Sequence, residues 1–74
     1  KKVTEKQLQR VVTKDYIWKQ GDRMWRLASR EFGDPRLWWV IARMNNKPTD
    51  ALFETGQIIK IPTDVTIALE VFGV

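Results

Sequence analysis

The stretch YIWKQGDRMWRLASREFGDPRLWWVIARMNN, residues 16–46, decides the fold of this chain. Asp22 is predicted to cap a first helix, and Gly33 has the position of a glycine that ends one. Asp34 and Pro35 then start a second helix, because a capping Asp followed by Pro at the first helical position is a strong start signal. Two short helices joined this closely are predicted to pack as a tight hairpin.

The apolar residues of both predicted helices recur every three or four positions, which is typical of helices that bury one face. The two faces consist of Met24, Leu27, Ala28 and Phe32 in the first helix and of Leu37, Val40, Ile41 and Met44 in the second. Trp25 and Trp38 flank these faces, and we predict that both pack in the core. Trp39 falls on the opposite side of the second helix, between Arg36 and Arg43.

Short β-prone runs bracket the two helices. Residues 16–18 form the first run, and residues 58–61 form the second, which Pro62 ends. Strands from the two ends of one unit are expected to pair antiparallel, with the helices covering one face of the sheet. The sequence therefore predicts a small α+β domain of βααβ order over residues 16–62.

Arms are predicted on both sides of this unit. Residues 1–15 are polar and basic with no sustained period, and they predict an extended N-terminal arm. Residues 63–74 alternate between apolar and other side chains, which is the pattern of a strand. The apolar side of this strand-like C-terminal tail consists of Val65, Ile67, Leu69 and Val71.

The composition excludes several chemistries. The 74 residues include no Cys and no His, so a disulfide framework is excluded and the commonest general base and metal ligand are missing. Asp22 and Asp34 bracket one helix from opposite ends, too far apart to act as a catalytic pair of carboxylates. We therefore predict no enzymatic activity, no catalytic residue, no metal and no cofactor. No apolar run approaches the ~18 residues of a membrane span, so no membrane partner is expected.

The charge is unevenly distributed along the chain. The formal net charge is +4, yet residues 1–47 hold 12 of the 13 Lys and Arg. This asymmetry predicts electrostatic pairing with a partner or with another copy. Arg23, Arg26 and Arg30 form a stripe on the first helix, which raises nucleic-acid binding as a hypothesis. The acidic second half and the lack of a nucleic-acid motif disfavour it.

Residues 16–28, 32–38 and 56–62, together with Asn45 and Leu52, resemble the LysM family in the order of their motifs. The resemblance covers about 47 of the 74 residues. It implies a βααβ fold and, for most of the family, binding of N-acetylglucosamine polymers such as peptidoglycan. The implied glycan groove comprises Gly21, Asp22, Arg23, Met24, Asn46, Ala51 and Leu52.

A narrower resemblance links residues 33–42 to LysM-like proteins of contractile phage tails and related injection machines. It implies a structural assembly protein of a tail or baseplate, located in the virion and holding other tail proteins in several copies. The alternative is a cell-wall-associated, peptidoglycan-binding LysM module. Arg23 stands where the family has a small hydroxyl residue, and this departure favours assembly over glycan binding.

A partner interface is predicted on two surfaces. Trp39 with its flanking arginines has the composition of a binding hot spot, and the C-terminal tail is expected to pair with a strand edge of a neighbouring subunit. The alternatives are that Trp39 lies under an arm and that the tail folds back onto its own sheet. The interface residues are predicted to be Trp39, Arg36, Arg43, Val65, Ile67, Leu69 and Val71.

Overall fold

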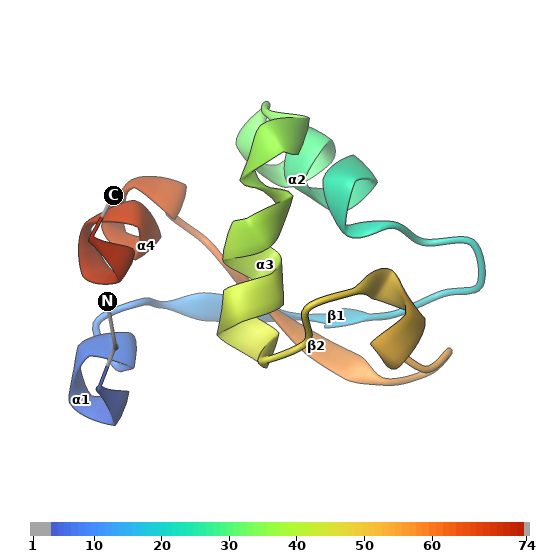
Figure 1. Ribbon diagram of the computed structural model, residues 1–74, viewed down its shortest axis with the longest axis horizontal. Helices are drawn as coiled ribbons and strands as arrows, with labels where there is room; N and C mark the ends of the chain where they lie inside the picture. The colour runs from blue at the N-terminus through green and yellow to red at the C-terminus, as the bar shows by residue number, and fades with distance from the viewer. Residues whose placement is uncertain (1–3, 74) are drawn as a thin grey trace.

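The computed structural model describes residues 4–73, which fold into a small α+β domain (Figure 1). Its elements in chain order are α1 (Glu5–Leu8), β1 (Thr13–Ile17), α2 (Met24–Phe32), the 3₁₀ turn η1 (Pro35–Leu37), α3 (Trp38–Asn45), the 3₁₀ turn η2 (Asp50–Leu52), β2 (Ile58–Pro62) and α4 (Val65–Phe72). The order β1, α2, α3, β2 confirms the predicted βααβ unit.

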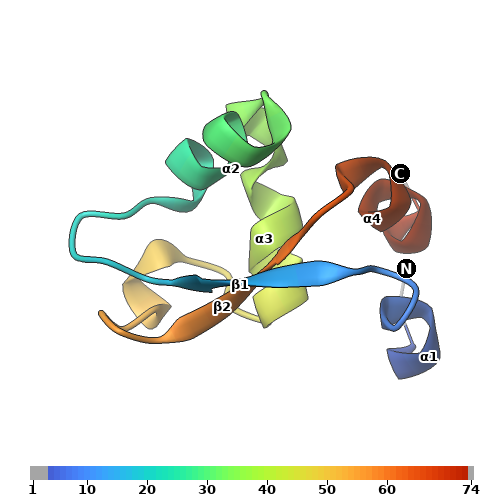
Figure 2. The ribbon, with the colours of Figure 1, turned by 180° about the vertical axis from the view of Figure 1, so that it is seen from behind.

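The two strands form one antiparallel sheet that the hairpin of α2 and α3 covers on one face (Figures 1 and 2). Tyr16 lies opposite Ile59, and Lys14 lies opposite Ile61. Ile59 and Ile61 are fully buried because their side of the pleat faces the helices. β1 begins at Thr13, three residues before the predicted strand, so the unit extends into the predicted N-terminal arm.

The local signals between the two helices act as predicted. Gly33 ends α2 in the left-handed conformation, with a φ of 77°. Asp34 accepts the backbone N–H of Arg36, and Pro35 opens η1. The apolar faces of the helices meet the sheet in a first core made of Trp18, Met24, Leu27, Ala28, Ile41, Ala42, Phe53, Ile59 and Ile61.

Asn45, the last residue of α3, closes the outer edge of β2. Its Nδ2 donates to the carbonyl oxygens of Ile41 and Lys60, each at 2.8 Å, and its Oδ1 accepts the N–H of Lys60 at 2.7 Å. Alternate residues of an antiparallel pair direct their backbone groups to opposite edges, so Lys60 would otherwise have an open edge. One amide thus replaces a third strand and ties α3 to the sheet.

Replacing Asn45 by Ala is expected to lower the free energy of unfolding by about 2 kcal/mol, because three hydrogen bonds are lost at once. Urea denaturation followed by circular dichroism measures the change. The matched control is Asn46→Gly at the next residue, which has a φ of 53° and where glycine fits the left-handed conformation without strain. Equal stability of Asn45→Ala and Asn46→Gly would contradict a structural role for the Asn45 amide.

The C-terminal tail is a helix, and the predicted strand is wrong. Asp64 caps α4 by accepting the N–H of Thr66 at 2.9 Å, and Gly73 ends the helix with a φ of 77°. The buried face of α4 consists of Ala68, Val71 and Phe72, which are spaced three and four residues apart. The segment therefore satisfies its backbone groups internally, and it has no open strand to offer a neighbouring subunit.

A second core joins this tail to the rest of the domain. It consists of Val11, Val40, Ala68, Val71 and Phe72, with Leu8, Leu37 and Trp39 among the half-buried residues packed around it. The first and last helices, α1 and α4, lie on the same side of the molecule (Figure 2). The predicted extended arms are thus wrong for residues 4–15 and 63–73, which pack on the domain, and residues 1–3 of the predicted N-terminal arm lie outside the described residues.

Candidate functional site

Trp25 and Trp38 point outward from the starts of α2 and α3. Their exposed fractions are 49% and 41%, so the prediction that both pack in the core is wrong. Each turn of a helix holds 3.6 residues, and Met24 and Leu27 occupy the buried face of α2. The residue after Met24 is therefore rotated away from the core. Both tryptophans lie at the edges of the apolar faces, a position that by itself does not decide between exposure and burial.

A hollow of about 330 Å³ lies between these two rings and the segment that leads into η2. We call it the Trp25–Trp38 hollow. Its lining residues are Met24, Trp25, Trp38, Pro48, Thr49 and Asp50. Most of this lining is apolar, and the guanidinium of Arg26 lies 5.1 Å from the centre of the Trp25 ring. The hollow has the size and surface to receive an apolar side chain of a partner.

Asp50 holds the two walls of this hollow together. Its Oδ1 accepts the backbone N–H of Met24 at 2.8 Å, so a carboxylate 26 residues away caps the start of α2. The prediction that Asp22 is this cap is wrong. Asp22 instead accepts the Tyr16 hydroxyl at 2.7 Å and the Lys19 N–H at 2.8 Å, which fixes the turn before the helix. Both segments that frame the hollow are therefore fixed by side-chain hydrogen bonds.

A second hollow, of about 480 Å³, lies where the resemblance to LysM placed a glycan groove. We call it the Arg23 hollow. Its lining residues are Trp18, Gln20, Gly21, Arg23, Thr49, Asp50, Ala51, Phe53 and Thr55. The structure thus brings together Gly21, Arg23 and Ala51 of the predicted glycan residues. Met24 belongs to the Trp25–Trp38 hollow instead, and Leu52 is 49% exposed on η2.

The third hollow, of about 250 Å³, lies at the end of α3. We call it the Lys47 hollow. Its lining residues are Ala42, Arg43, Asn46, Lys47 and Pro48. Asn46, predicted as a glycan residue, thus faces a different hollow from Gly21. Pro48 is shared with the Trp25–Trp38 hollow, and Thr49 and Asp50 are shared between that hollow and the Arg23 hollow. Neighbouring hollows thus share wall residues along 46–51, and we call the three hollows together the groove.

The predicted partner-interface residues of η1 and α3 make contacts within the domain. Trp39 is half-buried, and its ring lies 6.0 Å from that of Phe72 on α4. The guanidinium of Arg43 lies 4.4 Å from the centre of the Phe72 ring, and Arg36 forms an ion pair with Asp34. The alternative that Trp39 lies under an arm thus describes the structure.

The predicted interface residues of the tail also face the domain. Val71 is only 3% exposed, and Val65, Ile67 and Leu69 pack around the second core. These four residues do not form one exposed row, as the predicted strand required.

Ion pairs shift the pKa values of two acidic groups among the described residues. The hydrogen bond from Lys14 and, to a smaller extent, that from Arg30 hold the pKa of Glu31 below its usual value. Hydrogen bonds from Arg36 likewise lower the pKa of Asp34. Among residues 4–73, no three acidic side chains lie close enough together to hold a metal ion. Nor does any helix of this part of the chain have the length and apolar character to cross a membrane.

Searches with the whole chain give no further assignment: no protein-family model, no curated protein and no solved structure matches it.

Proposed function

We propose that this chain is a non-catalytic assembly protein that holds a neighbouring protein in the Trp25–Trp38 hollow. The observation that carries the proposal is the exposure of two large rings on either side of one apolar hollow. Tryptophan is enriched among the residues that dominate binding energy, above all where it lines a pocket that a partner fills. The resemblance to LysM-like proteins of contractile phage tails supports a tail or baseplate of a virion, or a related injection particle, as the setting.

The rigidity of the hollow supports this proposal. Asp50 caps α2 from the opposite wall, and Gly33 and Pro35 hold the short connection between the two helices. A preformed pocket loses little conformational entropy when it is filled, so more of the contact energy appears as affinity. Both tryptophans start helices, which limits the movement of their backbone.

Peptidoglycan binding is the second candidate, and the Arg23 hollow favours it. This hollow combines the edges of Trp18 and Phe53 with polar side chains such as Gln20, Thr49 and Thr55. Such a lining offers hydrogen bonds to sugar hydroxyls beside an apolar surface. Arg23 weakens the resemblance to the LysM family at this site, because a long cationic side chain lies where the family has a small hydroxyl residue.

Replacing Trp25 and Trp38 together by Ser is expected to remove the chain from the particle it belongs to, while the isolated protein stays folded. Loss of one such ring at a hot spot weakens binding about 30-fold. Sedimentation of particles from producing cells, followed by immunoblotting, measures incorporation. The matched control is Ile17→Ser with Ile58→Ser, since both isoleucines are 56% exposed on the sheet and neither is among the described residues that line the three hollows.

Normal incorporation of the double Trp variant would contradict the proposal. Titration with chitin tetramer distinguishes the assembly function from peptidoglycan binding. If the assembly proposal is right, calorimetry shows no heat of binding and NMR shows no shift of the indole N–H signals. Micromolar binding that Thr49→Val abolishes would favour the glycan-binding function.

A further inference from the structure

The groove has an apolar centre and cationic ends. Arg23 lines one end and Lys47 lines the other, and Arg26, at the same end of the molecule as Arg23, stacks on the ring of Trp25. None of the three forms an ion pair with a described side chain, and Arg23 donates from Nη1 to the carbonyl oxygen of Asp22 at 2.9 Å. Positive charge is therefore available along the whole groove.

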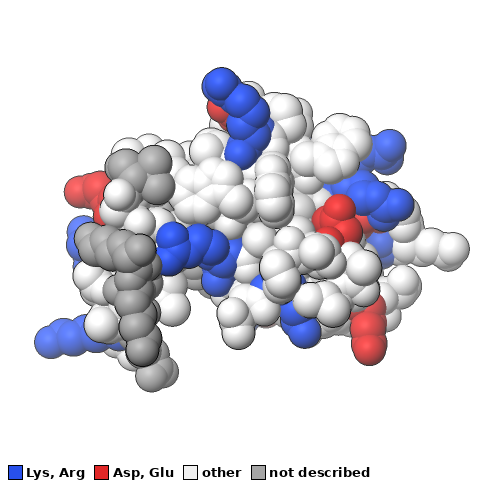
Figure 3. All heavy atoms as spheres, viewed as in Figure 1, with Lys and Arg blue, Asp and Glu red and all other residues white. Residues whose placement is uncertain are grey.

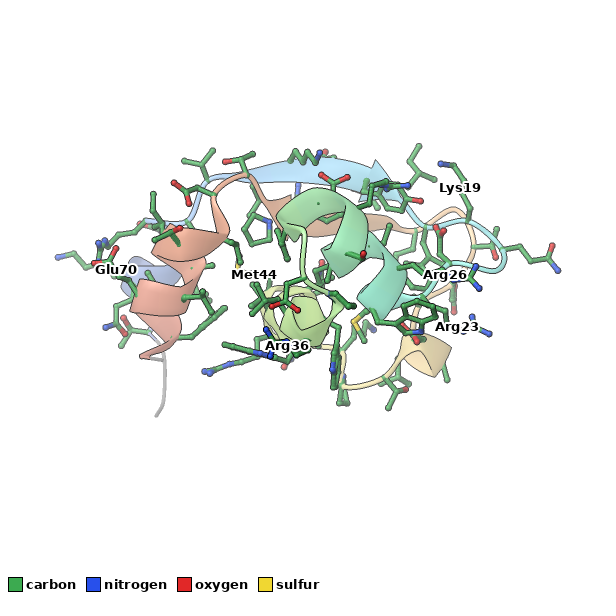
Figure 4. The ribbon with its side chains drawn as sticks, turned by 90° about the horizontal axis from the view of Figure 1, so that it is seen from above. Lys19, Arg23, Arg26, Arg36, Met44 and Glu70 are labelled. Atoms are coloured by element: carbon green, nitrogen blue, oxygen red, sulfur yellow. The ribbon has the colours of Figure 1, made fainter. Side chains whose placement is uncertain are left out.

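The described acidic residues of the domain form no ion pair with these cations. Lys19, Arg23 and Arg26 point outward at one end of the molecule, whereas Glu70 lies at the opposite end (Figure 4). Figure 3 shows Lys and Arg atoms beside the uncharged surface on the side where α2 begins. Asp50 is the one carboxylate among the described lining residues; it lines two of the three hollows, and its Oδ1 already accepts the N–H of Met24. The partial positive charge at the N-terminus of α2 further offsets the negative charge of Asp50.

We propose that the groove binds an extended segment of a partner protein in which an apolar side chain is flanked by carboxylates. The apolar side chain fills the Trp25–Trp38 hollow. Carboxylates on its two sides approach Arg23 and Arg26 at one end and Lys47 at the other. This inference rests on the proposed function, whose partner it describes.

The shape of the groove favours an extended segment. Three small hollows that share their wall residues receive successive side chains, and alternate side chains of an extended chain lie ~7 Å apart on one side. A neutral glycan has no group that requires cations at both ends. A nucleic acid would bring a phosphate towards Asp50 in the middle, so the distribution of charge favours a peptide with acidic flanks.

A random 12-residue peptide library, selected on the immobilised protein, tests the inference without knowledge of the partner. The selected peptides are expected to carry Asp or Glu on both sides of a Phe, Leu, Tyr or Trp. The strongest peptide is then synthesised with a fluorescein label, and its affinity is measured by fluorescence anisotropy. The variant Arg23→Gln with Lys47→Gln is expected to bind it about fivefold more weakly at low salt, as two exposed ion pairs are lost.

The control variant is Lys6→Gln with Arg10→Gln, which removes the same net charge from the opposite end of the molecule. It is expected to bind like the wild type, and 0.5 M NaCl is expected to reduce the difference between the two variants. Peptides without acidic flanks, equal affinity of the two variants, or no selected peptide at all would overturn the inference. If peptides without acidic flanks are selected and their binding still requires Trp25 and Trp38, the inferred acidic flanks are wrong but the proposed function stands. If their binding does not require the two tryptophans, the proposed function is wrong as well.

Discussion

Replacing Phe72 by Ala is expected to lower the free energy of unfolding by about 3–4 kcal/mol. Phe72 is 3% exposed and lies in the second core, where its ring contacts Trp39 and Arg43. Removing a buried ring loses its transfer free energy and leaves a cavity that a short helix cannot fill. Since domains of this size are stable by only 5–15 kcal/mol, the variant would unfold at a much lower temperature.

Thermal and urea denaturation of the whole chain measure this effect. Glu70→Gln is the matched control, because Glu70 is exposed on the same helix and its replacement is expected to change stability by less than about 0.5 kcal/mol. Deleting residues 63–74 is expected to destabilise the domain at least as much as Phe72→Ala. Unchanged stability of Phe72→Ala would mean that α4 is not docked on α3.

Trp18→Ala is expected to cost about 3–5 kcal/mol of unfolding free energy, whereas Trp38→Ala costs about 1 kcal/mol. Trp18 is 5% exposed, and its ring centre lies 4.5 Å from that of Phe53. Its backbone also bonds to Gly56 and Gln57, so it links the turn before β2 to the first core. Trp38, by contrast, is 41% exposed at the groove.

Urea midpoints of the two variants, measured under the same conditions, give the comparison. The same chemical change is made in both, so the difference reports burial rather than residue type. A larger loss for Trp38→Ala than for Trp18→Ala would reverse the assignment of core and groove. It would also remove the basis of the proposed function, since the rings of the hollow would then be structural.

The βααβ unit was predictable because its signals are local. Gly33 tolerates a positive φ, Asp34 accepts a nearby N–H, and Pro35 fits the first turn of a helix, whatever the rest of the chain does. The spacing of Met24 and Leu27 likewise depends only on the helical repeat. Such features are properties of short segments, and a sequence displays them directly.

The C-terminal tail was not predictable from alternation. Residues 65–72 contain aliphatic side chains at every second position, which fits a strand, but also Ala68, Val71 and Phe72 at helical spacing. Asp64 and Gly73 were the overlooked signals, since they match a helix cap and a helix end. The choice between the strand pattern and the helix pattern depends on which apolar side chains another element covers. Val40 on α3 packs against Ala68, Val71 and Phe72, which are the side chains at helical spacing.

The groove also separates what the sequence determines from what the tertiary structure decides. The sequence by itself determined the α+β class, the two central helices and the loops that frame the groove. The tertiary structure alone decided that Asp50 rather than Asp22 caps α2, and that Trp25 and Trp38 face outward while Trp39 is covered by α4. The reason is physical: a cap needs any carboxylate within hydrogen-bond distance, and a ring is buried only where another element arrives to cover it. Both depend on residues that are distant in the chain and meet only when it has folded.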